Sequence, residues 1–517
     1  MSTFNIQNLE TKPITLATEN SELKKENNIL KERNEHLHEE YERLLHIIKV
    51  ANRNQYGAKS EKYMDAENGK QLLLLDSIET AVVEENESDQ TETISYERKK
   101  RSRKNQKANL PRKELIIEVV GANRICQCGC EKKLIRYETF DKVHFQPAEF
   151  YMLSEKREVL GCPNGCESPV TAEKPKAALP KVAATEELLS HIAVSKTLDR
   201  QPLYHLEKQF ETRYQTIISR QKMARWMIAM GAVFQPLINL MKETLLSYDI
   251  AGFDATTLQV LKESGRSPTT KSYAYCFRGG PPGKEVVLYD YVAEKHKEFL
   301  ADWFLDYQGT LHVDADPWFK DLPLTGLINL CKCNAHARRK FEQIMKVSKK
   351  GGLAKQAVLR YQAIYKIEKE AKRLKLSPEE RYDLRQKKTK PLMDEFKLWL
   401  DEYQEKVLPK SPIGKAIQYC LNHWAGLVQF LEDGRLEADN NLTEQQIKYF
   451  VMGRKNWMFT DTVGGAESLV IHYGLMLTAK MHKLDPYQYY VSILNQLPHC
   501  KSIEDFESLL PWNMALP

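Results

Sequence analysis

The chain lacks any long apolar segment. None of its apolar runs approaches the roughly 18 to 20 residues that a membrane-spanning helix needs. The first ten residues, MSTFNIQNLE, also lack the charged and then apolar pattern of a secretory signal peptide. These two absences argue against a membrane or secreted protein, and we expect a cytoplasmic one.

Cysteine is scarce, and half of it is concentrated in one region. The chain has 10 cysteines, five of them between residues 126 and 166. In a cytoplasmic protein such a cluster indicates metal ligands rather than disulfides. The sequence predicts a structural zinc site of four thiolates within residues 110–180, with buried cysteines that bind no metal as the alternative. Five sulfurs compete for four places: Cys126, Cys128, Cys130, Cys162 and Cys166.

The net charge is only +6, but its distribution is uneven. Residues 63–109 form a charged stretch with few apolar side chains, which we interpret as a flexible linker. Its basic part carries no acidic residue, so it can act as an arm on nucleic acid or as a solubilising linker. The cations that we expect to contact DNA there are Arg98, Lys99, Lys100, Arg101, Arg103 and Lys104.

A heptad repeat of leucine runs through residues 16–48. Asparagine fills most of the companion apolar position, which favours a parallel, two-stranded coiled coil. We therefore interpret residues 1–62 as a dimerisation helix, giving a homodimer or a higher oligomer. The alternative is a single amphipathic helix packed on its own domain.

Residues 181–245 are predicted to be helical. Their first part suggests two or three short helices, with Ser219 as an N-cap of the last. Arg220, Lys222 and Arg225 near that helix start favour a helix-turn-helix-like DNA-binding domain. Many helical bundles share this pattern.

Short apolar runs that alternate with polar residues follow from residue 246 onwards. They predict strands at 248–260, 272–279, 284–293, 310–315 and 325–332. Helices between and after them indicate a mixed sheet covered by helices. Asp254 lies on the first of these strands, and Asp314 ends the fourth.

A polar helix is expected near residues 439–457. Glu444 follows closely on Asp439, Asn440 and Asn441, and the run GRKNW comes about two turns later. A carboxylate beside amides, before a basic-aromatic segment, suits a metal site that handles phosphate. The alternative is an ordinary polar helix without a metal site, with Asp439 as its N-cap and Glu444 in solvent. Together with Asp254 and Asp314, Glu444 could hold a pair of divalent ions.

Several of these stretches resemble one family, the large TnpC-type transposases of the insertion sequence 66 family, in the DDE superfamily. The similar segments are CNAHARRKF at 333–341, the DNN-two-residues-E stretch at 439–444, MGRKNWMF at 452–459, and the tail LTAKMHKLDPYQYYVSILNQLP. The resemblance implies an RNase H-like core in which Asp254, Asp314 and Glu444 form the catalytic triad.

The resemblance also implies ligands and partners. It implies Mg²⁺ (or Mn²⁺) at the triad, and Cys128-Gly129 resembles a family zinc ligand, which favours Cys126, Cys128, Cys162 and Cys166, with Cys130 as the rival. It implies binding to transposon ends and target DNA, small accessory proteins of the same element, and a bacterial, nucleoid-associated location. The cations and neighbours that we expect at DNA near this core are His336, Arg338, Arg339, Arg454, Lys455, Asn456 and Trp457.

The expected organisation is a multidomain α+β protein. The core would occupy residues 246–347 and 431–482, interrupted by a helical insertion at 348–430 that touches DNA or a partner subunit or serves as scaffolding. Residues 483–517 would form a helical tail.

The sequence departs from the family pattern next to each triad position. Ala255-Thr256, Ala315-Asp316 and Gln445 stand where the family usually has Glu-Thr, Gly-Tyr and Arg. Asp316 is a rival for the second ligand, and Glu437 and Asp439 are rivals for the third. Two other functions therefore stay open. One is a catalytically decayed, dimeric, zinc-containing DNA-binding regulator, and the other is a metal nuclease without strand transfer.

Overall fold

A computed structural model gives the fold of most of the chain from residue 148 onwards. The described residues are 33, 116, 127, 130, 131, 133–138, 148–160, 163, 168, 170–294, 297–314, 327–347 and 352–515. The predicted coiled coil apart from Arg33, the basic arm, Asp316, and Cys126, Cys128, Cys162 and Cys166 lie outside these residues.

The chain forms two compact units, one of residues 1–57 and 153–517 and the other of residues 58–152. In the smaller unit the described side chains include the exposed residues Cys130, Leu134 and Ile135. The larger unit contains a short, exposed antiparallel pair of β1 (Val159–Leu160) and β2 (Val170–Thr171), as well as the sheet and helices described below.

Six strands form the central sheet of the larger unit, and five of them lie close to the positions that the sequence predicted. These five are β3 (Ile250–Lys262), β4 (Lys271–Gly279), β5 (Val286–Val292), β6 (Gly309–Val313) and β7 (Ile328–Lys332), in the order β5-β4-β3-β6-β7. β4 runs antiparallel to both of its neighbours, β3 and β5, whereas β6 and β7 run parallel to β3. The short β8 (Thr460–Thr462) pairs with the end of β3.

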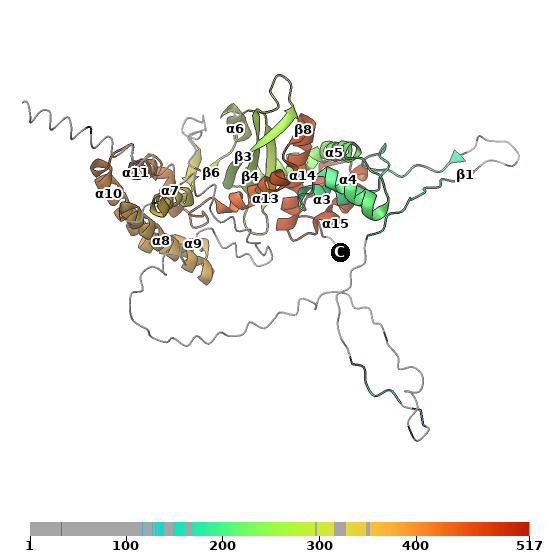
Figure 1. Ribbon diagram of the computed structural model, residues 1–517, viewed down its shortest axis with the longest axis horizontal. Helices are drawn as coiled ribbons and strands as arrows, with labels where there is room; N and C mark the ends of the chain where they lie inside the picture. Colours follow the sequence, from blue (N-terminus) through green and yellow to red (C-terminus); the bar gives the residue numbers. More distant parts are fainter. Residues whose placement is uncertain are drawn as a thin grey trace, which may run out of the picture. The chain divides into compact units, whose positions relative to one another are not determined.

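Helices cover both faces of this sheet (Figure 1). On one face, α13 (Asn441–Trp457) and α14 (Val463–Met481) pack on Leu258 and Cys276 in one apolar cluster. On the other face, α6 (Lys297–Trp303) brings the Trp303 ring onto that of Phe277, with centroids 3.8 Å apart. Cys276 and Phe277 are sequence neighbours, so strand alternation separates the two apolar sets. The mixed, helix-covered sheet was predicted.

Three helices precede the sheet, α3 (Glu186–Thr197), α4 (Leu203–Tyr214) and α5 (Arg220–Leu246). Ser219 caps α5 as predicted, because its side chain accepts a hydrogen bond from the Lys222 amide. The expectation of a short third helix was wrong, since α5 has 27 residues. Its buried face packs on α14, and Ser468 donates to the Met227 carbonyl at 2.6 Å. These helices therefore belong to the same compact unit as the sheet.

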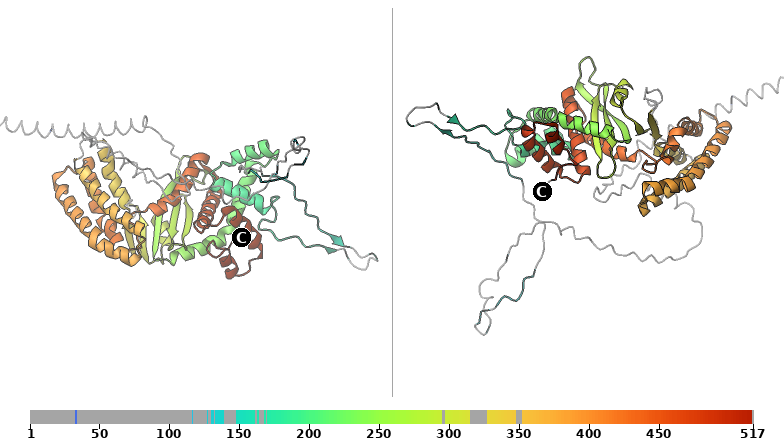
Figure 2. Two further views of the ribbon diagram at one scale, coloured as in Figure 1. Left: turned by 90° about the horizontal axis from the view of Figure 1, so that it is seen from below. Right: turned by 180° about the vertical axis from the view of Figure 1, so that it is seen from behind.

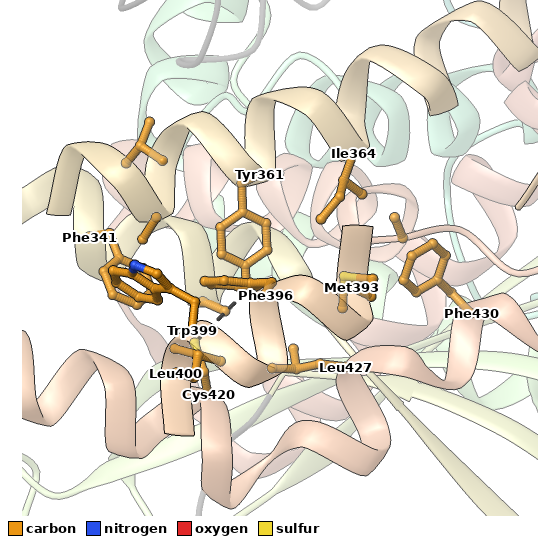
Figure 3. Close-up of a cluster of buried hydrophobic side chains, with 14 of the residues drawn as sticks. Phe341, Tyr361, Ile364, Met393, Phe396, Trp399, Leu400, Cys420, Leu427 and Phe430 are labelled. Carbon is orange, nitrogen blue, oxygen red and sulfur yellow. Dashed lines mark hydrogen bonds between the residues drawn. The ribbon is translucent and has the colours of Figure 1, made fainter. Parts of the chain in front are cut away.

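The predicted helical insertion lies beside β7, away from α5 and α14 (Figure 2). It follows α7 (Asn334–Val347) and comprises α8 (Gly352–Leu374), α9 (Pro378–Leu384), a π-helical turn η5 (Arg385–Thr389), α10 (Lys390–Lys406), α11 (Pro412–Asn422), α12 (Trp424–Val428) and η6 (Gln429–Leu431). Its buried core contains Tyr361, Phe396 and Trp399 (Figure 3). Phe341 of α7 and Leu436, which follows η6, also belong to that core, so the insertion packs against chain on both sides of it.

The carboxyl-terminal tail completes the unit with α15 (Pro486–Gln496), η7 (Leu497–His499) and α16 (Ile503–Ser508). Asp485 opens α15 by accepting a hydrogen bond from the Gln488 amide. The buried His472 of α14 bonds to Tyr490 of α15 at 3.0 Å. Among the helices of the described residues, none is long and apolar enough to cross a membrane.

Candidate catalytic site

The first two candidate acids lie side by side because β3 and β6 are parallel neighbours. The ladder pairs Gly252 with His312, and the same offset places Asp254 opposite Asp314, one residue beyond the end of β6. Side chains alternate along a strand, so both acids point to the face on which Gly252 meets α13. The strand patterns in the sequence were sufficient to predict the strands that carry these two acids, whereas their catalytic role stays a prediction.

The helix that carries His336 starts immediately after β7. Asn334 is the first residue of α7, and its buried side-chain amide donates to the carbonyls of Leu427 and Ala438 at 2.9 and 3.1 Å. These bonds tie the start of α7 to the segment that precedes α13. His336 is thereby placed at the carboxyl ends of β6 and β7.

The helix that carries Glu444 is fixed to β3 through its first turn. The Asn440 side chain donates to the Phe253 carbonyl at 2.9 Å, and its backbone N–H donates to Cys333 Sγ at 3.2 Å. A Cβ at Gly252 would lie 2.2 Å from Thr443 Oγ1, so only glycine lets α13 approach the strand this closely. Glu444 follows one residue later and reaches the same edge of the sheet.

Four side chains converge at this edge. Asp314, Cys333, His336 and Glu444 each offer one atom, and these atoms lie within 4.8 Å of one another. His336 Nδ1 is 3.1 Å from Asp314 Oδ1 and 3.6 Å from Glu444 Oε1. Apart from this mutual contact, the three atoms are buried without a hydrogen-bond partner among the described residues. Asp254 is not one of this group of four.

The charges at the site perturb one another. Burial and then the charge of Asp314 raise the pKa of Asp254 to about 7, although the Ala255 N–H donates to its carboxylate at 2.7 Å. Glu444 also raises the pKa of Asp254. Burial lowers the pKa of His336, but its hydrogen bond with Asp314 and the charge of that carboxylate outweigh burial and raise it. The carboxylates therefore repel one another and attract a cation.

These donors fit a divalent cation. Carboxylate oxygens and one imidazole are ligands that Mg²⁺ or Mn²⁺ accepts, and the buried atoms of Asp314, His336 and Glu444 lie within 4.8 Å of one another. Cys333 does not fit as a hard-metal ligand, because burial raises the pKa of its thiol well above the usual value. Its sulfur accepts the bond from Asn440 instead, which makes Cys333 part of the support of α13.

Comparison with known proteins identifies the family of this chain. A family model described as "Transposase IS66 family" matches residues 181–468, which is more than half of the chain. The chain belongs to this transposase family. A model described as "IS66 C-terminal element" matches residues 475–512, and one described as "Transposase C of IS166 homeodomain" matches residues 43–115, a range that includes the stretch expected to be a charged linker.

Three relatives come from Sinorhizobium fredii, each described as an "Uncharacterized protein". The protein y4qI is 29% identical over 486 residues, covering 91% of this chain and 88% of the relative. The protein y4jD is 30% identical over 420 residues, covering 78% of this chain and 80% of the relative. The protein y4hP is 24% identical over 486 residues, covering 89% and 86%.

Two rivals for the third ligand interact with other residues. Glu437 pairs with Arg381 at 3.0 Å and with Lys372 at 2.7 Å, outside the group of converging atoms. Asp439 accepts a hydrogen bond from the Asn441 amide at 3.2 Å and is likewise outside that group. Glu444, the first choice for the third acid, is the one that meets Asp314.

Several predicted DNA contacts are occupied inside the protein. Arg338 is buried in an ion pair with Glu342 at 2.7 Å. Arg454 donates to the hydroxyl of Thr256 and to Thr257, and Trp457 is buried in the cluster under α13 and α14. In this structure these three side chains support the fold.

Other predicted contacts remain available to DNA. Lys455 and Asn456 are exposed near the end of α13, and Arg339 is exposed beside His336, with its guanidinium 3.1 Å from His336 Nε2. The α5 cations Arg220, Lys222 and Arg225 are also exposed. DNA binding by these residues stays a prediction, as do the zinc ligands and the basic arm outside the described residues.

Sequence reasoning missed the residues that hold the site together. Cys333, Asn334 and Asn440 belong to motifs that were recognised, but their bonds join segments far apart in the chain. Gly252 and Thr443 gave no signal at all, because their close contact exists only after the sheet and α13 have packed.

Proposed function

We propose that this chain is an active DDE transposase that cleaves DNA at the ends of its element and transfers the freed 3′-hydroxyl into target DNA. The observation that carries the proposal is the convergence of Asp314, His336 and Glu444 at the edge of the sheet, next to Asp254. The mixed sheet with helices on both faces supports an RNase H-like core. Family membership supports DNA as the substrate.

In this proposal Asp254, Asp314 and Glu444 hold Mg²⁺ or Mn²⁺. Divalent ions there would lower the pKa of the attacking water and stabilise charge on the phosphate and leaving oxygen. His336 contacts both Asp314 and Glu444 and orients their carboxylates. The same three acids serve cleavage and strand transfer, because both are in-line displacements at phosphorus.

The assembly that carries out this reaction is also proposed. A coiled coil at residues 1–62 would pair two subunits, so that each holds one element end. The match at residues 43–115 to a model described as a homeodomain supports end recognition near the amino terminus. Structural zinc at Cys126, Cys128, Cys162 and Cys166 and small accessory proteins remain part of the proposal.

A labelled fragment of the DNA that flanks the gene tests the catalytic proposal. The wild-type protein should cleave this fragment in Mg²⁺ or Mn²⁺, and EDTA should abolish the cleavage. Asp314→Asn should bind the fragment but not cut it, and the control Asp401→Asn, in an exposed pair with Lys397, should cut normally. Equal cutting by wild type and Asp314→Asn would rule out the proposed site.

A decayed, DNA-binding regulator is the second candidate, because Ala255, Ala315 and Gln445 replace the neighbours that the resemblance leads us to expect. Wild type that binds the fragment without cutting it in either metal would favour that candidate. Cut ends that never join a target plasmid would favour a nuclease without strand transfer.

A further inference from the structure

The segment that precedes α13, the helix of Glu444, is irregular. Side chains of the insertion nevertheless form several hydrogen bonds with it. Arg385 of η5 is fully buried and donates to the carbonyls of Phe430, Asp433 and Leu436 at 2.6 to 2.9 Å. Its remaining bonds go to both oxygens of Glu368 in α8. One side chain thus fixes the path of residues 430–436.

A second arginine of the insertion binds the same segment at a point closer to the candidate site. Arg381 of α9 donates two hydrogen bonds, each 3.0 Å long, to the two oxygens of Glu437. It also donates to Glu368 Oε2 at 2.7 Å. A planar guanidinium that binds a carboxylate through two parallel bonds fixes its position and its orientation. Lys372 of α8 contacts the same Glu437 carboxylate at 2.7 Å.

From Glu437 the chain reaches the catalytic helix within a few residues. The Ala438 carbonyl is bound by Asn334 of α7, and the Asn440 amide group is bound to β3. The first turn of α13 then forms on the Asn440 carbonyl, which accepts from the amides of Thr443 and Glu444 at 3.1 and 3.0 Å. The segment is therefore clamped between the insertion on one side and the sheet on the other.

We propose that Arg381 and Glu437 are positioning residues, through which the helical insertion sets the place of Glu444 at the edge of the sheet. The inference rests on the proposed catalytic role of Glu444. It gives the insertion a function in catalysis that needs no contact with DNA. A misplacement of about 1 Å at a reacting group can cost about 100-fold in rate.

The test compares two arginines of the insertion. Arg381→Gln breaks the bridge to Glu437. Arg360→Gln is the matched control, because Arg360 pairs with Glu395 at 3.5 Å and lies over the Trp399 ring, both within the insertion. We expect Arg381→Gln to lower the cleavage rate by about 100-fold with DNA affinity unchanged, whereas Arg360→Gln keeps the rate.

Hydrogen exchange gives a readout that needs no cleavage. The amides of Thr443 and Glu444 should exchange faster in Arg381→Gln and at the wild-type rate in Arg360→Gln. Arg381→Lys should recover part of the protection, since a lysine reaches one oxygen of Glu437. If Arg381→Gln fails to fold, Glu437→Gln and Arg381→Lys supply the same comparison.

A double variant separates a joint role from two independent ones. If the residues act through each other, Arg381→Gln with Glu437→Gln loses no more activity than the worse single variant. Additive losses, or wild-type exchange of the Thr443 and Glu444 amides in Arg381→Gln, would overturn the inference. A wild-type protein that cuts no DNA would defeat the proposed function alone, because the exchange experiment still decides the positioning role.

Discussion

The two halves of the candidate site are held in place by different kinds of interaction. Asp254 and Asp314 are set by a regular parallel ladder between β3 and β6. His336 and Glu444 lie at the starts of helices that follow strand ends or irregular chain, and side-chain hydrogen bonds fix them. The ladder half depends on repeated local pattern, whereas the helix half depends on a few specific long-range contacts. Substitutions should reveal this difference.

The largest effect should come from the ladder half. Asp254→Asn should lower cleavage by about 1,000-fold or more, because ligand charge at such a site is worth several kcal/mol. DNA affinity and the melting temperature should change little, since a parallel ladder does not need this carboxylate. Cleavage and binding assays on one preparation check both. Cleavage within tenfold of wild type would restrict the site to Asp314, His336 and Glu444.

The helix half should show its largest effect in stability. Arg385→Met leaves Glu368 without its main partner and three carbonyls without a donor, and it should lower the free energy of unfolding by about 3 to 5 kcal/mol. Chemical denaturation measures this loss. The exposed pair of Lys397 and Asp401 supplies the contrast, as Lys397→Ala should cost less than about 1 kcal/mol. Equal losses in the two variants would contradict the structural role of Arg385.

Gly252 is the position at which β3 and α13 come into close contact, and a methyl group there should push α13 away from the strand. Gly252→Ala places a Cβ against Thr443 Oγ1 and should cost about 1 to 3 kcal/mol, with a loss of cleavage. Thr443→Ala removes the clashing oxygen, so the double variant should regain stability relative to Gly252→Ala alone. Denaturation of the single and double variants gives the coupling. An additive cycle would show that α13 does not pack as described.

The smallest expected effect is on the stability of the fold at acidic pH. Burial alone would raise the pKa of Glu437, but the bonds and charges of Arg381 and Lys372 outweigh it and lower the pKa to about 2, from an ordinary 4.5. The charged form therefore stabilises the fold above pH 4.5, and this contribution is lost as the pH falls toward 2. Wild type should lose stability in that range faster than Glu437→Gln. Parallel acid titrations followed by circular dichroism would show identical curves if the pair contributes nothing.

The sequence predicted the strands of the ladder half, but it did not predict the long-range contacts that hold the helix half. Alternating apolar residues were enough to place β3, β4 and β5. Between β4 and β5, Gly280 adopts a positive φ of 94°, which suits a tight turn. The length of α5 was missed because Gly231 and Pro236 lie inside it, and these residue types usually interrupt or end a helix. The bonds of Arg385 to carbonyls about fifty residues away leave no local pattern, so its charged helix looked like a solvated face.

The place of the insertion in the chain also matters during synthesis. The ribosome synthesises Asp254 and Asp314 before the insertion and Glu444 after it. A chain that stops anywhere within α8 to α12 therefore contains Asp254 and Asp314 but lacks Glu444. Under the proposed function, this order of translation keeps unfinished copies from cutting DNA.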